Sequence, residues 1–346
     1  MTSRERTLTA LKGGKPDMVP FLNEYTDIEI LGGILGFDAT ESKKAPRLDP
    51  YDETSFDLPS GFTKYDFVRK MCQDSFLAPR RMPPLFVETQ TTPDGKNIVV
   101  DGKIKTREDL KVVKLPKIDE EYLHGLYEFV EQYRNADLAI YFKTRMGPSG
   151  VLNSMGLNNF AYSLIDDPEL PVLLLEMYAE WCIELLKKIQ EIEIDFLWFA
   201  DDLAFNTAPM FSPDVFREIF LPTMRKVVSY IKVPWVYHTD GNVLPIMEDL
   251  LSLGMNGLNP LEPGAMDIEE IKQKYGKRLC LIGNIDLHYT LTMGTVEEVE
   301  TEVKNRIASI GKDGGFILSS ANSLPYYCKL ENVIAMRDAF LKYRKY

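Results

Sequence analysis

The feature that most restricts the fold of this chain is a series of short apolar runs separated by helical patterns, beginning at Lys114. Such alternation is typical of βα units and a parallel sheet. We expect strands at 138–144, 196–200, 235–238, 257–259, 279–282 and 316–319. Capping signals, such as Ser212 before Pro213, Asp267 with Glu270, and Thr295 with Glu298, mark where the intervening helices begin.

The first third of the chain is less regular. Thr2 and Glu5 have the spacing of a capping box, which predicts a short helix ending at Gly13 and Gly14. We expect a first strand at 18–23 and then an irregular segment, at about 32–61, long enough to form a rim or lid.

Two further strand patterns, 85–92 and 97–100, flank Pro93-Asp94-Gly95 and predict a β-hairpin. With one more strand between 65 and 100, the strand count reaches about eight, the number of a closed barrel. The expected fold is therefore a (β/α)₈ TIM barrel with an N-terminal irregular insertion and a β-hairpin.

Length and charge restrict the domain organisation and the partners. No linker or repeat divides the 346 residues, so we expect one domain over 1–346 with insertions at about 32–110. The net charge of −12 argues against nucleic acid or an anionic membrane as partner, because both require a basic surface. No run approaches the ~18 apolar residues of a membrane span, and the start has no apolar signal core. We expect a cytoplasmic protein; the oligomeric state stays open.

The four cysteines are widely scattered and form no Cys-x-x-Cys pair. This spacing is unlike a disulfide scaffold or an all-cysteine zinc site. We expect reduced thiols packed mostly in the core.

Polar residues follow most of the predicted strands, at the end where parallel barrels form their active sites. His238 directly follows the apolar run 233–237 and is one of three histidines, the other two lying in polar surroundings. Asp240 lies two residues on, and Gly241 permits a tight turn. A histidine at a strand end is also a common structural group. Carboxylates such as Asp201, Glu262 and Asp286 are, taken singly, equally typical of helix caps.

Several segments resemble the uroporphyrinogen decarboxylase superfamily. They are RERTLTALKGGKPDMVP, DDLAF, HTDGNVLPIMEDLLSLGMNGLNPLEP, GKRLCLIGNID and GGFILSSANSLP with ENVIAMRDAF, spread over nearly the whole chain. The resemblance implies a (β/α)₈ barrel and one of two chemistries: decarboxylation of a tetrapyrrole, or methyl transfer involving corrinoid proteins. The fold does not choose between them, so the pocket residues must.

The resemblance to two branches of the superfamily is incomplete. The decarboxylase branch has an arginine-rich segment after the first strand, where this chain has Glu24 and Asp27, which would repel a polycarboxylate. The thiol-directed methylcobamide methyltransferases have a His-x-Cys zinc pattern and a second cysteine on the last strand. This chain has Asp240 and Ala321 at those places, so we do not expect zinc. Both activities remain alternatives. The decarboxylase alternative would act on a smaller acid held by Arg145. A third alternative is a corrinoid-binding relative without catalytic activity.

The chain is similar to a third branch, the methyltransferases of anaerobic O-demethylation systems with a His-x-Asp-Gly motif. This similarity implies that a methyl group moves from a methyl ether, plausibly aromatic, to the Co(I) corrinoid (cobalamin) of a separate corrinoid protein. An aryl oxide leaves poorly unless a proton or strong hydrogen bond meets its oxygen. We therefore expect His238, Asp240, Glu24 and Asp202 to be catalytic. The expected substrate-binding residues are Tyr25, Arg145, Met146, Phe205, Asn259, Asn284, Asn322 and Tyr326.

Overall fold

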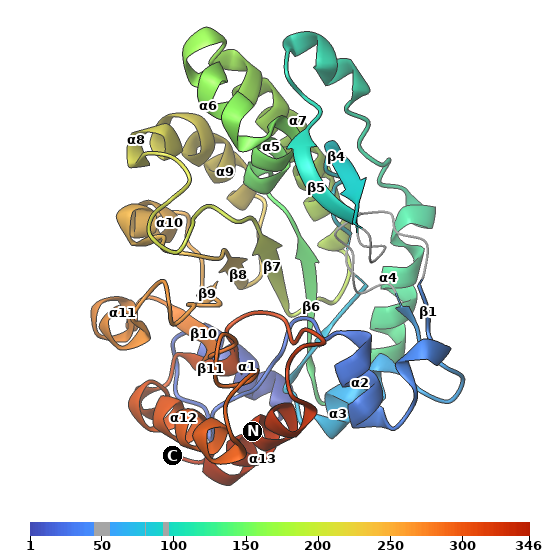
Figure 1. The fold of residues 1–346 in the computed structure, drawn as a ribbon, viewed down its shortest axis with the longest axis vertical. Coiled ribbons are helices and arrows are strands. Elements are labelled where there is room, and N and C mark those ends of the chain that lie inside the picture. The colour runs from blue at the N-terminus through green and yellow to red at the C-terminus, as the bar shows by residue number, and fades with distance from the viewer. Residues whose placement is uncertain (45–55, 80, 93–96) are drawn as a thin grey trace.

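A curled, seven-stranded parallel sheet forms the centre of the molecule (Figure 1). The structure is a computed structural model that describes residues 1–44, 56–79, 81–92 and 97–346. The strand order is β11-β10-β9-β8-β7-β6-β3, so strands that follow one another in the chain are neighbours in the sheet. The strands are β3 (Ser75–Leu77), β6 (Ala139–Thr144), β7 (Phe196–Ala200), β8 (Trp235–His238), β9 (Gly257–Asn259), β10 (Cys280–Ile285) and β11 (Phe316–Ser320). All six strands predicted after Lys114 are confirmed, with small shifts at their ends.

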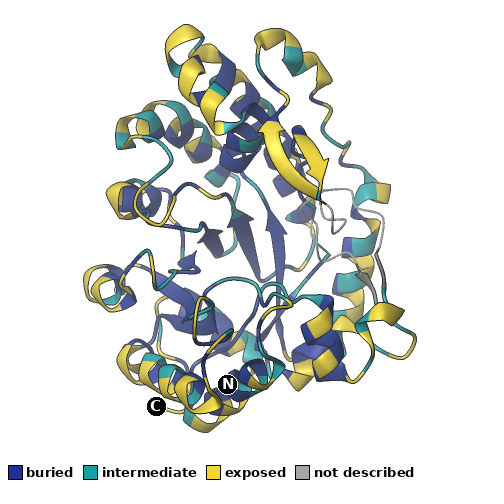
Figure 2. Ribbon diagram, in the orientation of Figure 1, coloured by how far each residue is buried: buried dark blue, intermediate teal, exposed yellow. Residues whose placement is uncertain are grey.

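Helices cover the outside of this sheet, with buried faces toward the strands and exposed faces outward (Figure 2). They are α1 (Ser3–Leu11), α2 (Ile28–Leu35), α3 (Lys64–Lys70), α4 (Glu120–Tyr133), α5 (Pro148–Met155), α6 (Leu157–Asp166), α7 (Glu169–Ile189), α8 (Pro213–Val215), α9 (Leu221–Val228), α10 (Met247–Leu251), α11 (Ile268–Tyr275), α12 (Val296–Ser309) and α13 (Leu330–Tyr343). The capping boxes predicted at Thr2 and Thr295 are confirmed. None of the helices in the described ranges is long and apolar enough to cross a membrane.

The strand predicted at 18–23 is wrong as a continuous strand. Leu22 donates to the Leu318 carbonyl of β11 at 3.1 Å, but the described segment forms only isolated bridges. On its other side it bonds to residues just before β3: the Asp74 N–H donates to the Phe21 carbonyl at 2.7 Å, the Phe21 N–H donates to the Asp74 carboxylate, and the Asn23 N–H donates to the Gln73 amide oxygen. The segment therefore connects the two edge strands, β11 and β3, without regular pairing to β3.

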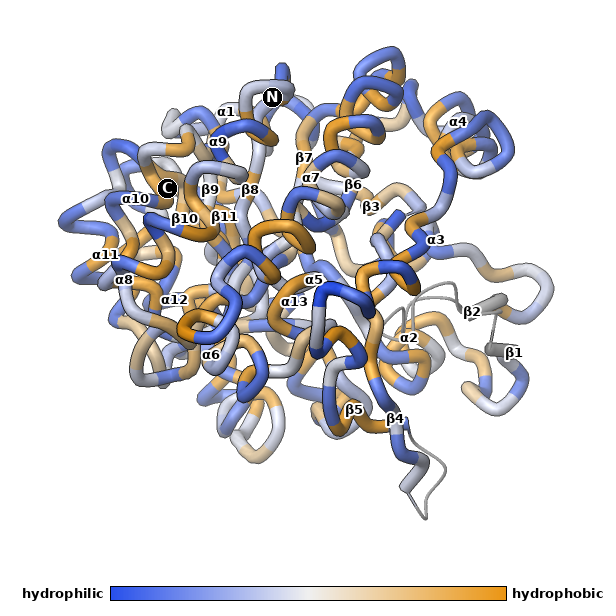
Figure 3. The backbone as a smooth tube through the Cα atoms, turned by 90° about the horizontal axis from the view of Figure 1, so that it is seen from above, coloured by the Kyte–Doolittle hydropathy of each residue, from blue (hydrophilic) through white to orange (hydrophobic). Residues whose placement is uncertain are grey.

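The predicted hairpin is confirmed by the antiparallel strands β4 (Val87–Thr91) and β5 (Asn97–Gly102), while its predicted turn at 93–95 lies outside the described residues. Both strands lie at the periphery, away from the central sheet (Figure 3). The hairpin is attached to the molecule at Gly102, where a Cβ atom would lie 2.3 Å from the Ser154 carbonyl oxygen of α5. It is an insertion beside the barrel-like core.

The irregular segment predicted at about 32–61 is wrong at its start, because residues 32–35 complete α2. Gly36 ends that helix in a left-handed conformation with φ of 94°. Two short antiparallel strands follow, β1 (Lys43–Lys44) and β2 (Phe56–Asp57), and the part at 45–55 lies outside the described residues. The four cysteines are free thiols, three of them buried, as predicted.

Candidate active site

The register of the sheet brings several strand ends together. His238, the last residue of β8, pairs with Ala200 of β7 and with Asn259 of β9. The residues that follow each strand therefore leave the sheet at one edge. That edge is the carboxyl end of the strands, where sequence analysis placed the active site.

A cavity of 220 Å³ lies at this edge. We call it the polar cavity. The predicted residues that line it are Glu24, Tyr25, Arg145, Asp202 and His238. Lys143, Ser149, Asn153 and Ser323 also contribute to its wall and had not been predicted.

The imidazole of His238 is buried, and two side chains hold its Nδ1. Its Nδ1 lies 2.6 Å from Oδ1 of Asn259 and 3.2 Å from Oε2 of Glu24. The Asn259 amide nitrogen donates to the Ile282 carbonyl, so its oxygen is the atom that faces the histidine. Nδ1 therefore carries the proton in the neutral ring, and Nε2 is left as an acceptor.

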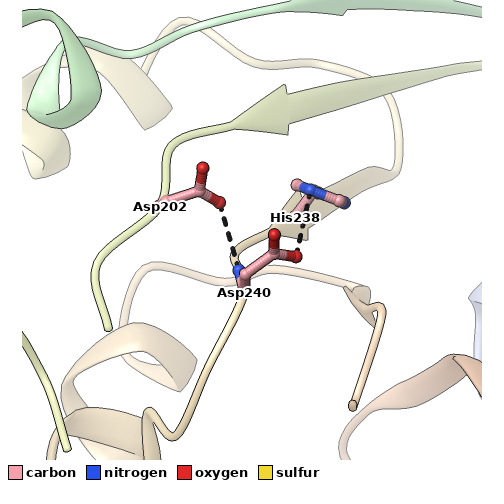
Figure 4. Close-up of side chains that lie close together, drawn as sticks. All are labelled: Asp202, His238 and Asp240. Carbon is pink, nitrogen blue, oxygen red and sulfur yellow. Dashed lines mark hydrogen bonds and ion pairs between the residues drawn. The ribbon is translucent and has the colours of Figure 1, made fainter. Parts of the chain in front are cut away.

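Asp240 lies next to this free nitrogen. Its Oδ1 is 3.6 Å from Nε2 of His238, and the Asn322 amide donates to both carboxylate oxygens at 3.0 and 2.9 Å. Figure 4 shows Asp202, His238 and Asp240 together, with the Asp240 N–H donating to Asp202 at 3.1 Å. Burial raises the pKa of Asp240 to about 6; His238 opposes this shift, while Asp202 and Glu262 add to it. A protonated carboxyl is thus accessible near neutral pH.

Lys143 is the main residue that sequence analysis missed. It lies on β6, is 7% exposed, and contacts Oε1 of Glu24 with its ammonium group. Burial, followed by the Arg145 guanidinium, lowers the pKa of Lys143 to about 7, while the Asp202 and Asp240 carboxylates oppose this shift. The available signal was a lysine inside an apolar strand, because a buried charge requires a partner.

All three carboxylates that were equally typical of helix caps bind backbone N–H groups at turns or helix starts. Asp201 is fully buried and accepts the N–H groups of Met146 and Ser149 at 2.7 and 2.8 Å, at the start of α5. Burial raises its pKa to about 6, although these two hydrogen bonds act in the other direction. Asp286 similarly accepts the N–H groups of His288 and Tyr289. Asp201 therefore orders the backbone that carries Ser149 of the cavity wall.

Glu262 supports the turn that follows His238. Its Oε2 accepts the N–H of Gly241 at 2.7 Å. Gly241 has φ of 79°, and a Cβ atom there would lie 2.5 Å from the Phe205 carbonyl oxygen, so the turn requires glycine. The tight turn expected at this position is confirmed.

Six of the eight predicted substrate-binding residues, and the predicted catalytic residue Asp240, do not line the polar cavity. Met146 is buried in the core, and Asn284 is buried with its amide donating to the Leu261 carbonyl. Phe205 and Tyr326 lie on loops and are each 53% exposed. Asn259 and Asn322 also lie outside its wall, but they orient His238 and Asp240 as described above.

The cluster in Figure 4 has the geometry of a cation site. Asp202, His238 and Asp240 each offer a ligand atom, and these atoms lie within 4.8 Å of one another. Imidazole nitrogen and carboxylate oxygen are ligands that Zn²⁺ and other divalent cations accept. The residues therefore fit a cation, and the expectation of a zinc-free protein stays a prediction.

Known proteins that are similar to this chain include members of one enzyme family. A family model described as uroporphyrinogen decarboxylase (URO-D) matches residues 89–343. Two curated relatives, both named methylcobamide:CoM methyltransferase MtaA, come from Methanosarcina barkeri and from its strain Fusaro. They are 28% and 27% identical to this chain over 170 residues, which is 48% of this chain and 48% of each relative. The matched part of the chain thus spans about half the length of these relatives.

Among solved structures, a methyltransferase from Methanosarcina mazei has the same fold over almost the entire length. The TM-score is 0.73 with 22% sequence identity, and the match covers 99% of both chains. At this identity the likeness concerns the fold alone.

Proposed function

The chain belongs to the uroporphyrinogen decarboxylase (URO-D) family, and from this premise we propose that it is a corrinoid-dependent methyltransferase. Its reaction moves a methyl group from a methyl ether, aromatic in our proposal, to the Co(I) corrinoid of a partner protein. One observation carries the proposal: a carboxyl group with a raised pKa, Asp240, lies beside Nε2 of His238, and His238 lines the polar cavity. The methyltransferase names of the two curated relatives support it.

The residues of the cavity provide what an ether needs to lose its methyl group. The corrinoid of the partner supplies the nucleophile. As the C–O bond breaks, the oxygen gains negative charge, and the proton of Asp240, alone or through His238, neutralises it. Asn259 and Glu24 hold the imidazole in one tautomer, and Asn322 holds the Asp240 carboxyl group. Lys143 balances the charge of Glu24.

A second candidate function is the transfer of a methyl group from a methylated corrinoid to a small thiol. The names of the curated relatives favour this candidate, because they include CoM as the methyl acceptor. The cluster of Asp202, His238 and Asp240 also favours it, because it fits a cation. A bound zinc ion would lower the pKa of such a thiol. This candidate and the first differ in their methyl donor and in their need for metal.

One assay separates the two. The purified protein is incubated with a reduced corrinoid protein and a panel of methoxyarenes, methanol and methylamines, while the cobalt absorption spectrum is followed. We expect methylation of the corrinoid with methoxyarenes. Demethylation of a methylated corrinoid by a thiol, without any reaction of ethers, would instead establish the second candidate.

Elemental analysis of the same preparation tests the metal. We expect activity without stoichiometric zinc. One tightly held zinc ion per chain, with activity lost on its removal and restored on its return, would contradict this expectation.

We further propose that the working fold is a closed barrel in a single domain, in which the segment around Phe21 takes the place of an eighth strand. The hydrogen bonds of the segment around Phe21 to β11 and to Asp74 support closure.

We propose that the corrinoid protein docks over the carboxyl ends of the strands, because the polar cavity lies there. The free thiols fit a cytoplasmic location.

A further inference from the structure

A second cavity lies beside the polar cavity and shares two of its lining residues, Glu24 and Tyr25. Its volume is 330 Å³, and its other walls come from α2, α3, β3 and α4. We call it the aromatic cavity, after the side chains of Tyr65, Phe76, Phe129 and Tyr133 that line it. The reaction described above does not use it.

Four aromatic rings form one side of this cavity. Tyr65 and Tyr133 stack with ring centroids 5.0 Å apart, and Phe76 lies 4.7 Å from Phe129 and 5.1 Å from Tyr133. Aliphatic side chains, including Ile28 and Leu31, line it as well. Such walls bind a flat apolar group by burial and by edge or face contacts between rings.

The polar groups at the inner end already have partners within the protein. The Gln73 amide oxygen accepts the N–H of Asn23 at 3.1 Å, and the Asn23 side chain donates to Ser320 at 3.0 Å. The Tyr25 hydroxyl donates to Asp27 at 2.8 Å. The part of a ligand that enters this cavity therefore does not need to be polar, because these groups are satisfied without it.

The volume suits a substituted ring. An apolar cavity of about 150 Å³ accommodates benzene, so 330 Å³ leaves room for a ring with one or two substituents. Glu24 lies at the junction of the two cavities, and its Oε2 is 3.2 Å from Nδ1 of His238. A ligand that fills the aromatic cavity and extends past Glu24 thus enters the polar cavity beside His238.

We propose that the aromatic cavity binds the ring of the methyl donor and that the ether oxygen extends past Glu24 into the polar cavity. This inference rests on the proposed transfer of a methyl group from an aryl methyl ether and adds where the aryl ring binds. Selectivity among donors then depends on residues of α3, β3 and α4, which lie outside the polar cavity.

Ring binding is tested without any corrinoid, using 4-fluoroanisole as the probe and its ¹⁹F NMR signal as the measurement. We expect saturable binding to the full-length wild-type chain. Leu77→Trp and Val68→Phe each add bulk to the cavity wall and should weaken binding at least tenfold. The matched control is Leu157→Trp, at a leucine that is 41% exposed and does not line the cavity, and binding should be unchanged. Circular dichroism verifies that each variant folds.

The wild-type chain alone provides a second test that needs no variant. Intermolecular NOEs from the ring protons of the probe to the methyl groups of Leu31 and Val68 would support the inference. Absence of saturable binding, or equal affinity in the wild type and both folded cavity variants, would overturn it.

Turnover measurements keep the two proposals apart. If the probe binds in the aromatic cavity but no ether is demethylated, the ring site stands and the proposed function fails. If aryl ethers are demethylated while the cavity variants neither weaken probe binding nor raise the KM for the donor, the function stands and the ring site is wrong.

Discussion

The polar and aromatic cavities meet at Glu24 and Tyr25 but are built in opposite ways. The polar cavity brings charged groups from separate strand ends into a network in which each orients the next. The aromatic cavity is lined largely by rings and aliphatic side chains, and its inner polar groups are already satisfied. The difference suggests a division of work, in which the polar cavity performs the reaction and the aromatic cavity provides affinity.

The largest effect is expected on stability, from Lys143→Met in the polar cavity. This change leaves Glu24 buried without its cation, and removing one partner of a buried ion pair typically costs about 3–5 kcal/mol. We expect a loss of this size in the free energy of unfolding, measured by urea denaturation. The control is Lys105→Met, which breaks an exposed pair with Asp101 and should cost at most about 1 kcal/mol.

A compensating change sharpens this prediction. Adding Glu24→Gln to Lys143→Met removes the unpaired charge and should recover much of the lost stability. If Lys143→Met costs no more than Lys105→Met, the buried pair does not contribute to folding as its geometry indicates.

The next largest effect concerns the proton. Asp240→Asn retains the shape of the side chain and removes its titratable proton, so turnover of an aryl ether should fall by about 10²-fold or more. His238→Gln should act similarly if the imidazole delivers the proton. Binding of 4-fluoroanisole should be nearly unchanged in both variants, because the ring lies in the other cavity.

The donor provides the internal control for this prediction. The loss should be smaller for ethers whose phenol product is more acidic, because a better leaving group needs less protonation. Full activity of both variants would remove the pair from the mechanism and direct attention to Glu24 and Asp202.

A change in the aromatic cavity should show the opposite pattern. Tyr133→Leu removes a ring from the wall and should raise the KM for an aryl ether by about tenfold, equivalent to ~1.4 kcal/mol, while kcat changes much less. Tyr162→Leu, at a tyrosine that is 66% exposed, should change neither constant. A fall in kcat without any change in KM would contradict the division of work.

The smallest expected effect is on the pH profile. With the pKa of Asp240 at about 6, its protonated fraction, and with it kcat, should fall about fivefold between pH 6 and pH 7. The sign follows from the role of an acid, which must hold its proton to donate it. Asp240→Asn should lack this decline, and the affinity for 4-fluoroanisole should not change over the same range. A rate that rises with pH would indicate a base instead.

The contrast between the polar and aromatic cavities also explains which parts of the site could be predicted from the sequence. His238, Asp240 and Asp202 follow strands with clear apolar patterns, so their convergence at one edge could be predicted from the strand count and direction alone. Lys143 was missed because it lies within a strand, where the pattern directs attention to apolar neighbours. Met146 was expected at the substrate because it follows β6, but its side chain turns into the core while its N–H binds Asp201.

The aromatic cavity could not be predicted in this way. Its rings come from residues 65, 76, 129 and 133, on three separate elements, and a ring facing a cavity has the same sequence pattern as a ring in a packed core. The strand expected at 18–23 failed for a related reason. Apart from one backbone bond from the Asp74 N–H, its partners on one side are the side chains of Asp74 and Gln73, and a local pattern cannot reveal bonds to distant side chains.

The hydrogen bond between Asn23 and Ser320 also bears on how the protein is made. The two residues are 297 positions apart, so the segment around Asn23 leaves the ribosome long before its partner on β11 exists. At about 5–20 residues per second, roughly 15–60 seconds of translation separate them. Until β11 is synthesised, the early segment has only its bonds to Gln73 and Asp74, and the growing edge of the sheet lacks its last strand. The nascent chain must therefore wait, alone or with a chaperone, before the two edges of the sheet are joined.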